Sequence, residues 1–155
     1  SFKGIGEAKA IKIAAAMELS FRRSEINQKK LDKINSSKSV FKIMSPLLGH
    51  LTHEEFWVLF LNNSNKILAK TQISKGGMTS TVVDVRIVMK QALEHSATAI
   101  VLVHNHPSGA LSPSKSDNRL TEKFKLAAES LDIKVLDHII VTEKTYFSFA
   151  DERLL

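Results

Sequence analysis

Apolar and polar positions recur along the chain with two different periods, which separates helices from strands. An apolar spacing near the helical period predicts helices, whereas alternation or a short β-branched run predicts strands. We expect helices over residues 7–22, 39–51 (interrupted near Pro46), 82–96 and 114–131, and strands over 54–62, 66–74, 97–106, 133–142 and 145–149. From residue 54 the order is strand, strand, helix, strand, helix, strand, strand, which predicts an α/β fold.

A polar, lysine-rich stretch from Ser24 to Ser39 follows the first helix and is predicted to be a linker. We therefore expect two parts, a helical segment with its linker over residues 1–36 and the main domain over 37–155. The chain starts at Ser1, without a methionine, and is expected to be a fragment.

Composition narrows the classes of function. The 22 Lys and Arg outnumber the 16 Asp and Glu, giving a net charge of +6, which favours weak, nonspecific contact with DNA but also fits a solvated surface. No apolar run approaches the roughly 18 residues of a membrane span, and no signal peptide is evident, so a cytoplasmic protein without membrane contact is expected. Because the chain has no cysteine, any metal must be held by nitrogen and oxygen ligands.

The most informative stretch is "VLVHNHPSGALSPSKSD", residues 101–117. His104 and His106 end a predicted strand two residues apart, so their side chains leave the same face about 7 Å apart and can converge on one ion. A turn follows, and Asp117, in the first turn of the next helix, can supply a third ligand. Two histidines and one carboxylate leave a fourth position for water, which is typical of catalytic zinc.

A structural interpretation competes with this one. Ser114 and Asp117 also fit an S-x-x-D helix start, in which the serine caps the helix and the acid favours the positive end of its dipole. The His-Asn-His run could be a polar strand end. Capping, however, does not explain two histidines on one face directly after an apolar run.

The spacing of His104, His106, Ser114 and Asp117 matches H-x-H-x7-S-x2-D and resembles the signature of JAMM (MPN+) metalloproteases. The segments "HNHPSG", "PSKSD", "LDHIIV" and "YFSFADERLL" resemble the bacterial RadC family, and the resemblance runs from Gly4 to Leu155. It implies a mixed, largely antiparallel curved sheet flanked by helices, of the JAMM/MPN, cytidine-deaminase-like architecture, after a short N-terminal helical segment.

The residues before the first helix also resemble a known motif. Gly4-Ile5-Gly6 is similar to the second half of a DNA-binding helix-hairpin-helix, whose turn offers backbone N–H groups to a phosphate. A glycine-punctuated helix start explains the same residues equally well. The first half of the hairpin is missing, which puts DNA binding by this chain in doubt.

The family resemblance assigns roles to the site residues. JAMM enzymes take their general base from an early strand, two residues before an aromatic, which selects Glu54 (before Phe56) and leaves Glu55 as the outward neighbour. Ser114 is expected to donate to the oxyanion, and one Zn²⁺ per chain is expected. Asp137 and His138 are left open between a hydrogen bond to a ligand and an ordinary structural place, whereas His50, His53 and His95 are expected at the surface.

Three functions are compatible with these residues to different degrees. The preferred one is a zinc-dependent hydrolase, a metallopeptidase or isopeptidase acting on an unknown peptide or protein, with oligomeric state undetermined. The alternative is a DNA-repair-associated module with a structural or vestigial metal site. Metal-dependent nucleic-acid cleavage is disfavoured, because it usually relies on carboxylate-rich, often two-metal sites.

Overall fold

The computed structural model describes residues 6–28, 33–76 and 83–155, and the chain divides into two compact units, Ser1–Asp32 and Lys33–Leu155. The first unit carries helix α1 (Glu7–Gln28). The expected end of this helix near Arg22 is wrong, because no Gly or Pro follows to stop it and it continues to Gln28. Gly4 and Ile5 lie outside the described residues, so the helix-hairpin-helix assignment stays a prediction.

Helix α2 (Ser37–Leu48) begins inside the stretch expected to be linker. Its "NSSKS" start is a capping box, in which Ser36 and Ser39 each accept a hydrogen bond from the other's backbone N–H. Pro46 does not interrupt the helix as expected. It lies in the last turn, and both Pro46 and Lys42, whose carbonyl loses its helical donor, are exposed, so water can satisfy that carbonyl.

The remaining elements confirm the expected order and the α/β class. They are β1 (Glu55–Leu61), β2 (Ile67–Lys75), α3 (Val85–Glu94), β3 (Ala99–Asn105), α4 (Lys115–Glu129), β4 (Lys134–Val141) and β5 (Tyr146–Ser148). Of the residues expected to form the third helix, Val82 lies outside the described residues. No helix in the described part of the chain is both long enough and apolar enough to cross a membrane.

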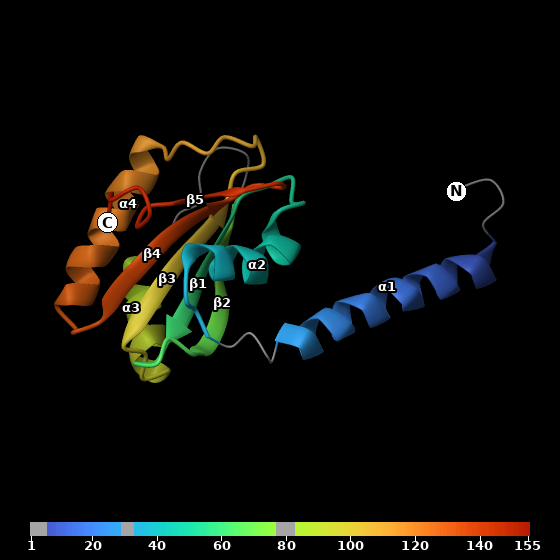
Figure 1. Cartoon of the computed structure of the whole chain (residues 1–155), viewed down its shortest axis with the longest axis horizontal. Coiled ribbons are helices and arrows are strands. Elements are labelled where there is room, and N and C mark those ends of the chain that lie inside the picture. The colour runs from blue at the N-terminus through green and yellow to red at the C-terminus, as the bar shows by residue number, and fades with distance from the viewer. Residues whose placement is uncertain (1–5, 29–32, 77–82) are drawn as a thin grey trace. The chain divides into compact units, whose positions relative to one another are not determined.

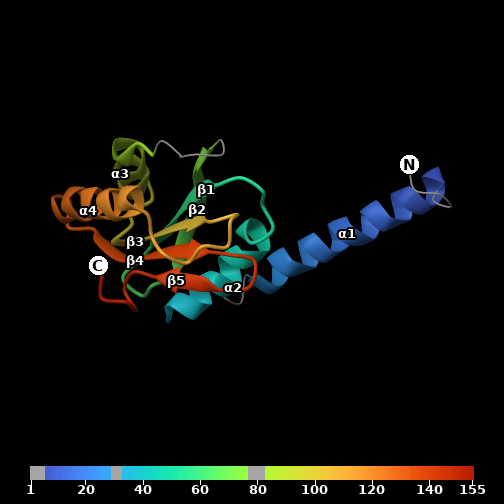
Figure 2. The ribbon, with the colours of Figure 1, turned by 90° about the horizontal axis from the view of Figure 1, so that it is seen from above.

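The strands form one mixed, unclosed sheet in the order β2-β1-β3-β4-β5. Only β3 and β4 run parallel, joined through α4, and the other neighbours are antiparallel. Helices α3 and α4 cover one face and α2 covers the other (Figures 1 and 2). The sheet is therefore buried on both sides, which explains why β3 is an unbroken buried run.

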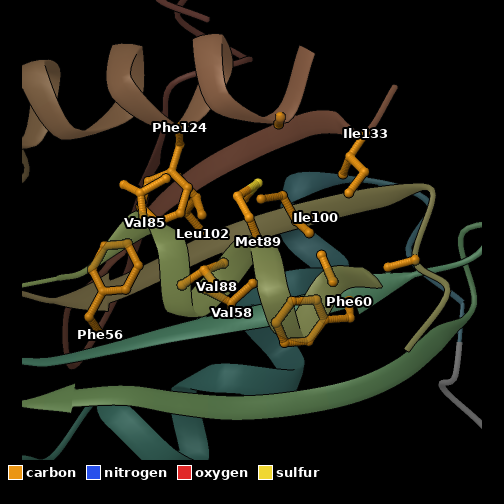
Figure 3. Close-up of a cluster of buried hydrophobic side chains, with 13 residues drawn as sticks. Phe56, Val58, Phe60, Val85, Val88, Met89, Ile100, Leu102, Phe124 and Ile133 are labelled. Carbon is orange, nitrogen blue, oxygen red and sulfur yellow. The ribbon is translucent and has the colours of Figure 1, made fainter. Parts of the chain in front are cut away.

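Strand alternation divides the core between these two faces. Even-numbered positions of β1 and β3, such as Phe56, Val58 and Leu102, pack against Val88 of α3 and Phe124 of α4 (Figure 3). Odd-numbered positions belong to the second cluster, which includes α2. The register pairs Phe56 with His104, so the start of β1 lies beside the end of β3. A side chain's sequence parity here decides which face it reaches.

Candidate metal centre

The end of β3 and the first turn of α4 bring three ligand atoms together. The Nε2 atoms of His104 and His106 lie 3.0 Å apart, and they lie 3.4 Å and 3.7 Å from the two carboxylate oxygens of Asp117. The ligand atoms of all three residues lie within 4.8 Å of one another. His106 stays in register after β3 because its N–H donates to the Val141 carbonyl at 3.0 Å. These three residues can hold a metal ion.

The hydrogen bonds around the histidines test whether this donor set suits a cation. His106 Nδ1 lies 2.7 Å from the Ala110 carbonyl oxygen, which can only accept, so Nδ1 carries the proton of the neutral ring and Nε2 presents a lone pair. That lone pair faces His104 Nε2 and the Asp117 carboxylate. A positive charge between the two ring nitrogens and the carboxylate balances this arrangement, and either a proton on His106 Nε2 or a divalent ion can supply it.

The electrostatics point the same way. Burial lowers the pKa of His104 to about 4, so this ring is neutral near pH 7. Burial alone would raise the pKa of Asp117, but the hydrogen bond with His106 and the positive charge that His104 carries in its protonated form outweigh it, and the pKa falls well below its usual range. The hydrogen bond with Asp117 raises the pKa of His106 against the effect of burial. His104 and Asp117 are thus in the ionisation states that ligate metal.

Glu54 lies at the same cavity as the three ligands. The cavity measures about 330 Å³ and is lined by Glu54, Phe56, His104, His106, Ser108, Ala110, Ser112, Ser114, Ser116, Asp117 and Leu120. Glu54 also raises the pKa of His106 as a minor contribution to its shift, which is consistent with a carboxylate near the metal ligands. The residue that the family pattern selected is therefore on the site's side of β1.

The backbone on both sides of Glu54 is held by Asn105, the residue between the two histidines. The Asn105 Oδ1 accepts from the Glu55 N–H at 2.8 Å, and its Nδ2 donates to the His53 carbonyl at 2.9 Å. The Glu54 carbonyl accepts from the Gly76 N–H at 3.0 Å. Asn105 was missed at the sequence level, although its odd position predicts that it leaves the sheet on the face opposite to the histidines.

Glu55 does not point outward to solvent as expected. It is 7% exposed, on the opposite face of β1, because that face is covered as well. Its carboxylate accepts from Trp57 Nε1 at 2.9 Å and lies 2.9 Å from His53 Nε2. Burial would raise its pKa, but these two bonds and nearby charges, including that of Lys75, together outweigh burial and lower it. His53 is accordingly half-buried and paired, whereas His50 and His95 are exposed as expected.

Ser114 and Asp117 serve the helix and the site at the same time. Ser114 is the N-cap of α4: its Oγ accepts from the Asp117 N–H at 3.1 Å, while Asp117 Oδ2 accepts from the Ser114 N–H at 2.7 Å. The Ser114 hydroxyl donates to Asp117 Oδ2 at 2.6 Å and lies 2.7 Å from Ser116 Oγ. It has one proton, so donation to a substrate oxygen requires rotation of the hydroxyl.

Because Asp117 both caps α4 and belongs to the candidate metal site, Asp117→Ala should change both fold stability and metal affinity. The metal-free chain should lose about 1 kcal/mol of unfolding free energy, because half of the capping box is removed. Metal affinity should fall less than on loss of either histidine, since solvent can replace a carboxylate oxygen. Denaturant unfolding of the metal-free chain and a chelator competition measure the two effects, and equal metal loss in Asp117→Ala and His106→Ala would contradict the ranking.

The sequence left the roles of Asp137 and His138 open, and only one of the two lies near the candidate metal ligands. Asp137 is buried away from the site: its carboxylate accepts from Ser148 Oγ at 2.7 Å and from the Ala150 N–H at 3.0 Å, which ties down the chain after β5. His138 lies on the histidine face, with Nε2 2.8 Å from His104 Nδ1. Of the two, only His138 contacts a candidate metal ligand.

Comparison with known proteins agrees with this geometry. Residues 34–154 match the family model described as "RadC-like JAB domain". A "UPF0758 protein" of Flavobacterium johnsoniae is 59% identical over 151 residues, covering 97% of this chain and 66% of that protein. One from Porphyromonas gingivalis is 45% identical over 156 residues, covering 100% and 69%. The chain thus spans about two thirds of these relatives, and their names state no activity. The chain belongs to the RadC family.

Proposed function

We propose that this chain is a zinc-dependent hydrolase that cleaves a peptide or isopeptide bond, with His104, His106 and Asp117 holding one Zn²⁺. The observation that carries the proposal is the meeting of this His-His-Asp group with Glu54 at one cavity. The donor set supports zinc, because two imidazoles and one carboxylate form a three-ligand site with one position open. A bound Zn²⁺ would polarise a carbonyl and lower the pKa of a coordinated water to about 7.

The chain's own groups then have separate tasks. Glu54 accepts the proton of the attacking water and delivers it to the leaving nitrogen, which is general base and then general acid catalysis. The Ser114 hydroxyl, turned away from Asp117, donates to the oxygen that gains charge at the tetrahedral carbon. Asn105 keeps the Glu54 backbone in register with the histidines through the two hydrogen bonds to its neighbours. The described residues contain a single group of candidate metal ligands, which does not favour two-metal chemistry on nucleic acid.

The test begins with metal-free protein titrated with Zn²⁺ and continues with a peptide library offered to the zinc-loaded chain. We expect one equivalent of zinc and zinc-dependent cleavage of an amide bond. Zinc binding with no hydrolysis, together with duplex DNA binding that survives about 200 mM salt, would favour the DNA-associated alternative, because contacts to phosphate alone weaken steeply with salt.

A further inference from the structure

A buried chain of hydrogen bonds runs from the first helical turn of α4 to the back of His104. Thr121 Oγ1 lies 2.7 Å from the Asp117 backbone carbonyl and 2.6 Å from His138 Nδ1. His138 Nε2 lies 2.8 Å from His104 Nδ1. This series of hydrogen bonds therefore begins at the backbone carbonyl of Asp117 and ends at His104 Nδ1. The other nitrogen of His104, Nε2, faces the Asp117 carboxylate.

The packing around His138 holds its ring in one orientation. It is fully buried, stacks on Phe149 with ring centroids 4.7 Å apart, and meets Phe56 edge-on at 5.7 Å. Neither of its two nitrogens has a carboxylate as a hydrogen-bond partner among the described residues. A buried imidazole between aromatic rings without an acidic partner stays neutral, so one nitrogen donates and the other accepts.

The number of available donors determines the direction of each hydrogen bond in this series. A backbone carbonyl only accepts, so the Thr121 hydroxyl donates its single proton to Asp117, and its oxygen must accept from His138 Nδ1–H. His138 Nε2 is then a lone pair that accepts from His104 Nδ1–H. His104 Nε2 is left with its own lone pair directed at His106 and Asp117.

The reverse direction of these hydrogen bonds leaves more of the groups without a suitable partner. If the Thr121 hydroxyl donated to His138, two oxygens would face each other at 2.7 Å with no hydrogen between them. His104 would then carry its hydrogen on Nε2, inside the site. In the forward direction, the contacts without a hydrogen are those among His104 Nε2, His106 Nε2 and the Asp117 carboxylate, where the cation is proposed to bind.

We infer that Thr121 and His138 are positioning residues that hold His104 in the Nδ1–H tautomer, so that its Nε2 is ready to bind the metal. The inference rests on the proposed metal site. Partners that hold a ligand's other nitrogen typically fix its tautomer and ring orientation, and their loss typically weakens metal binding about 10–100-fold. In this chain the carbonyl that sets the tautomer belongs to Asp117, whose carboxylate is itself a proposed ligand.

The first test reads the tautomers directly, by long-range ¹H–¹⁵N NMR of histidine-labelled protein in metal-free form at mildly alkaline pH. We expect protonated Nδ1 and unprotonated Nε2 on both His138 and His104. A hydrogen on His138 Nε2 would overturn the inference. Because this spectrum needs no metal and no substrate, it tests the tautomers separately from zinc binding. If the protein bound no zinc, the proposed function would fail while the tautomer assignment could still hold.

The second test compares threonine variants by chelator competition for Zn²⁺. Thr121→Val keeps the shape but removes the acceptor for His138 Nδ1–H, and should weaken zinc binding about 10–100-fold, whereas Thr121→Ser should restore it. Thr142→Val is the matched control, because Thr142 is also buried and its hydroxyl donates to a backbone carbonyl, that of Thr145 in a turn. Wild-type zinc affinity in Thr121→Val, or equal losses of zinc affinity in both valine variants, would contradict the positioning role of Thr121 and His138.

Discussion

Replacing Glu54 with glutamine is expected to lower kcat/KM for amide hydrolysis by about 10²–10⁴-fold, the usual contribution of general acid–base catalysis. Glutamine keeps the size of the side chain and can still hold a water, but it cannot accept that water's proton. Zinc content and melting temperature should stay near the wild type, because the Glu54 side chain has no hydrogen bond to the described residues and is only half-buried. Steady-state kinetics, elemental analysis and thermal unfolding measure the three quantities.

Glu55→Gln is the matched control for this experiment, since it removes the same charge from the adjacent position. The sequence placed Glu55 as the outward neighbour, but Glu55 is buried against Trp57 and His53. We now expect normal hydrolysis with a loss of about 1 kcal/mol in unfolding free energy, as a charged acceptor becomes neutral. If Glu55→Gln removed activity and Glu54→Gln kept it, the strand register would be wrong. If both kept it, the glutamate-base mechanism would be wrong.

Removing either histidine should abolish stoichiometric zinc binding and reduce hydrolysis to that of chelator-treated wild type, because two protein ligands remain. His106→Ala is the cleaner variant, since His106 is half-buried and, among the described residues, its ring forms hydrogen bonds only within the site and with Ala110. His104→Ala also leaves His138 Nε2 without its partner in the core, so a loss of fold stability accompanies the loss of metal.

Elemental analysis of both single variants and of the double variant checks this expectation. The wild type treated with chelator and then reloaded with Zn²⁺ is the control for irreversible damage. One equivalent of zinc retained by the double variant would rule out this site as the metal centre.

The sequence predicted the order of elements from local periodicity, and alternation put His104 and His106 on one face of their strand. Alternation left the choice between Glu54 and Glu55 open, and the family resemblance selected Glu54. The pairing of Phe56 with His104 then brings Glu54 beside the histidines. The capping and metal interpretations of Ser114 and Asp117 are compatible, because both residues form the capping box of α4 and also line the cavity of the candidate site.

What could not be predicted depends on which strands become neighbours. The contact between His104 and His138 exists because β4 lies beside β3 in parallel register, with Leu102 opposite His138. Nothing local to residues 133–142 specifies that neighbour. The burial of Glu55 likewise depends on the packing of the second face, which a strand pattern of two acids before an apolar run does not reveal.

The shared capping box changes how the signature should be read in distant relatives. Ser114 and Asp117 hold the start of α4 whether or not an ion is bound. A descendant that had abandoned metal chemistry would still gain stability from both, and His104 would still bond His138 in the core, whereas His106 would be the least constrained of the four. The serine and aspartate of the H-x-H-x7-S-x2-D pattern are therefore weak markers of an active enzyme, and the second histidine is the most informative position.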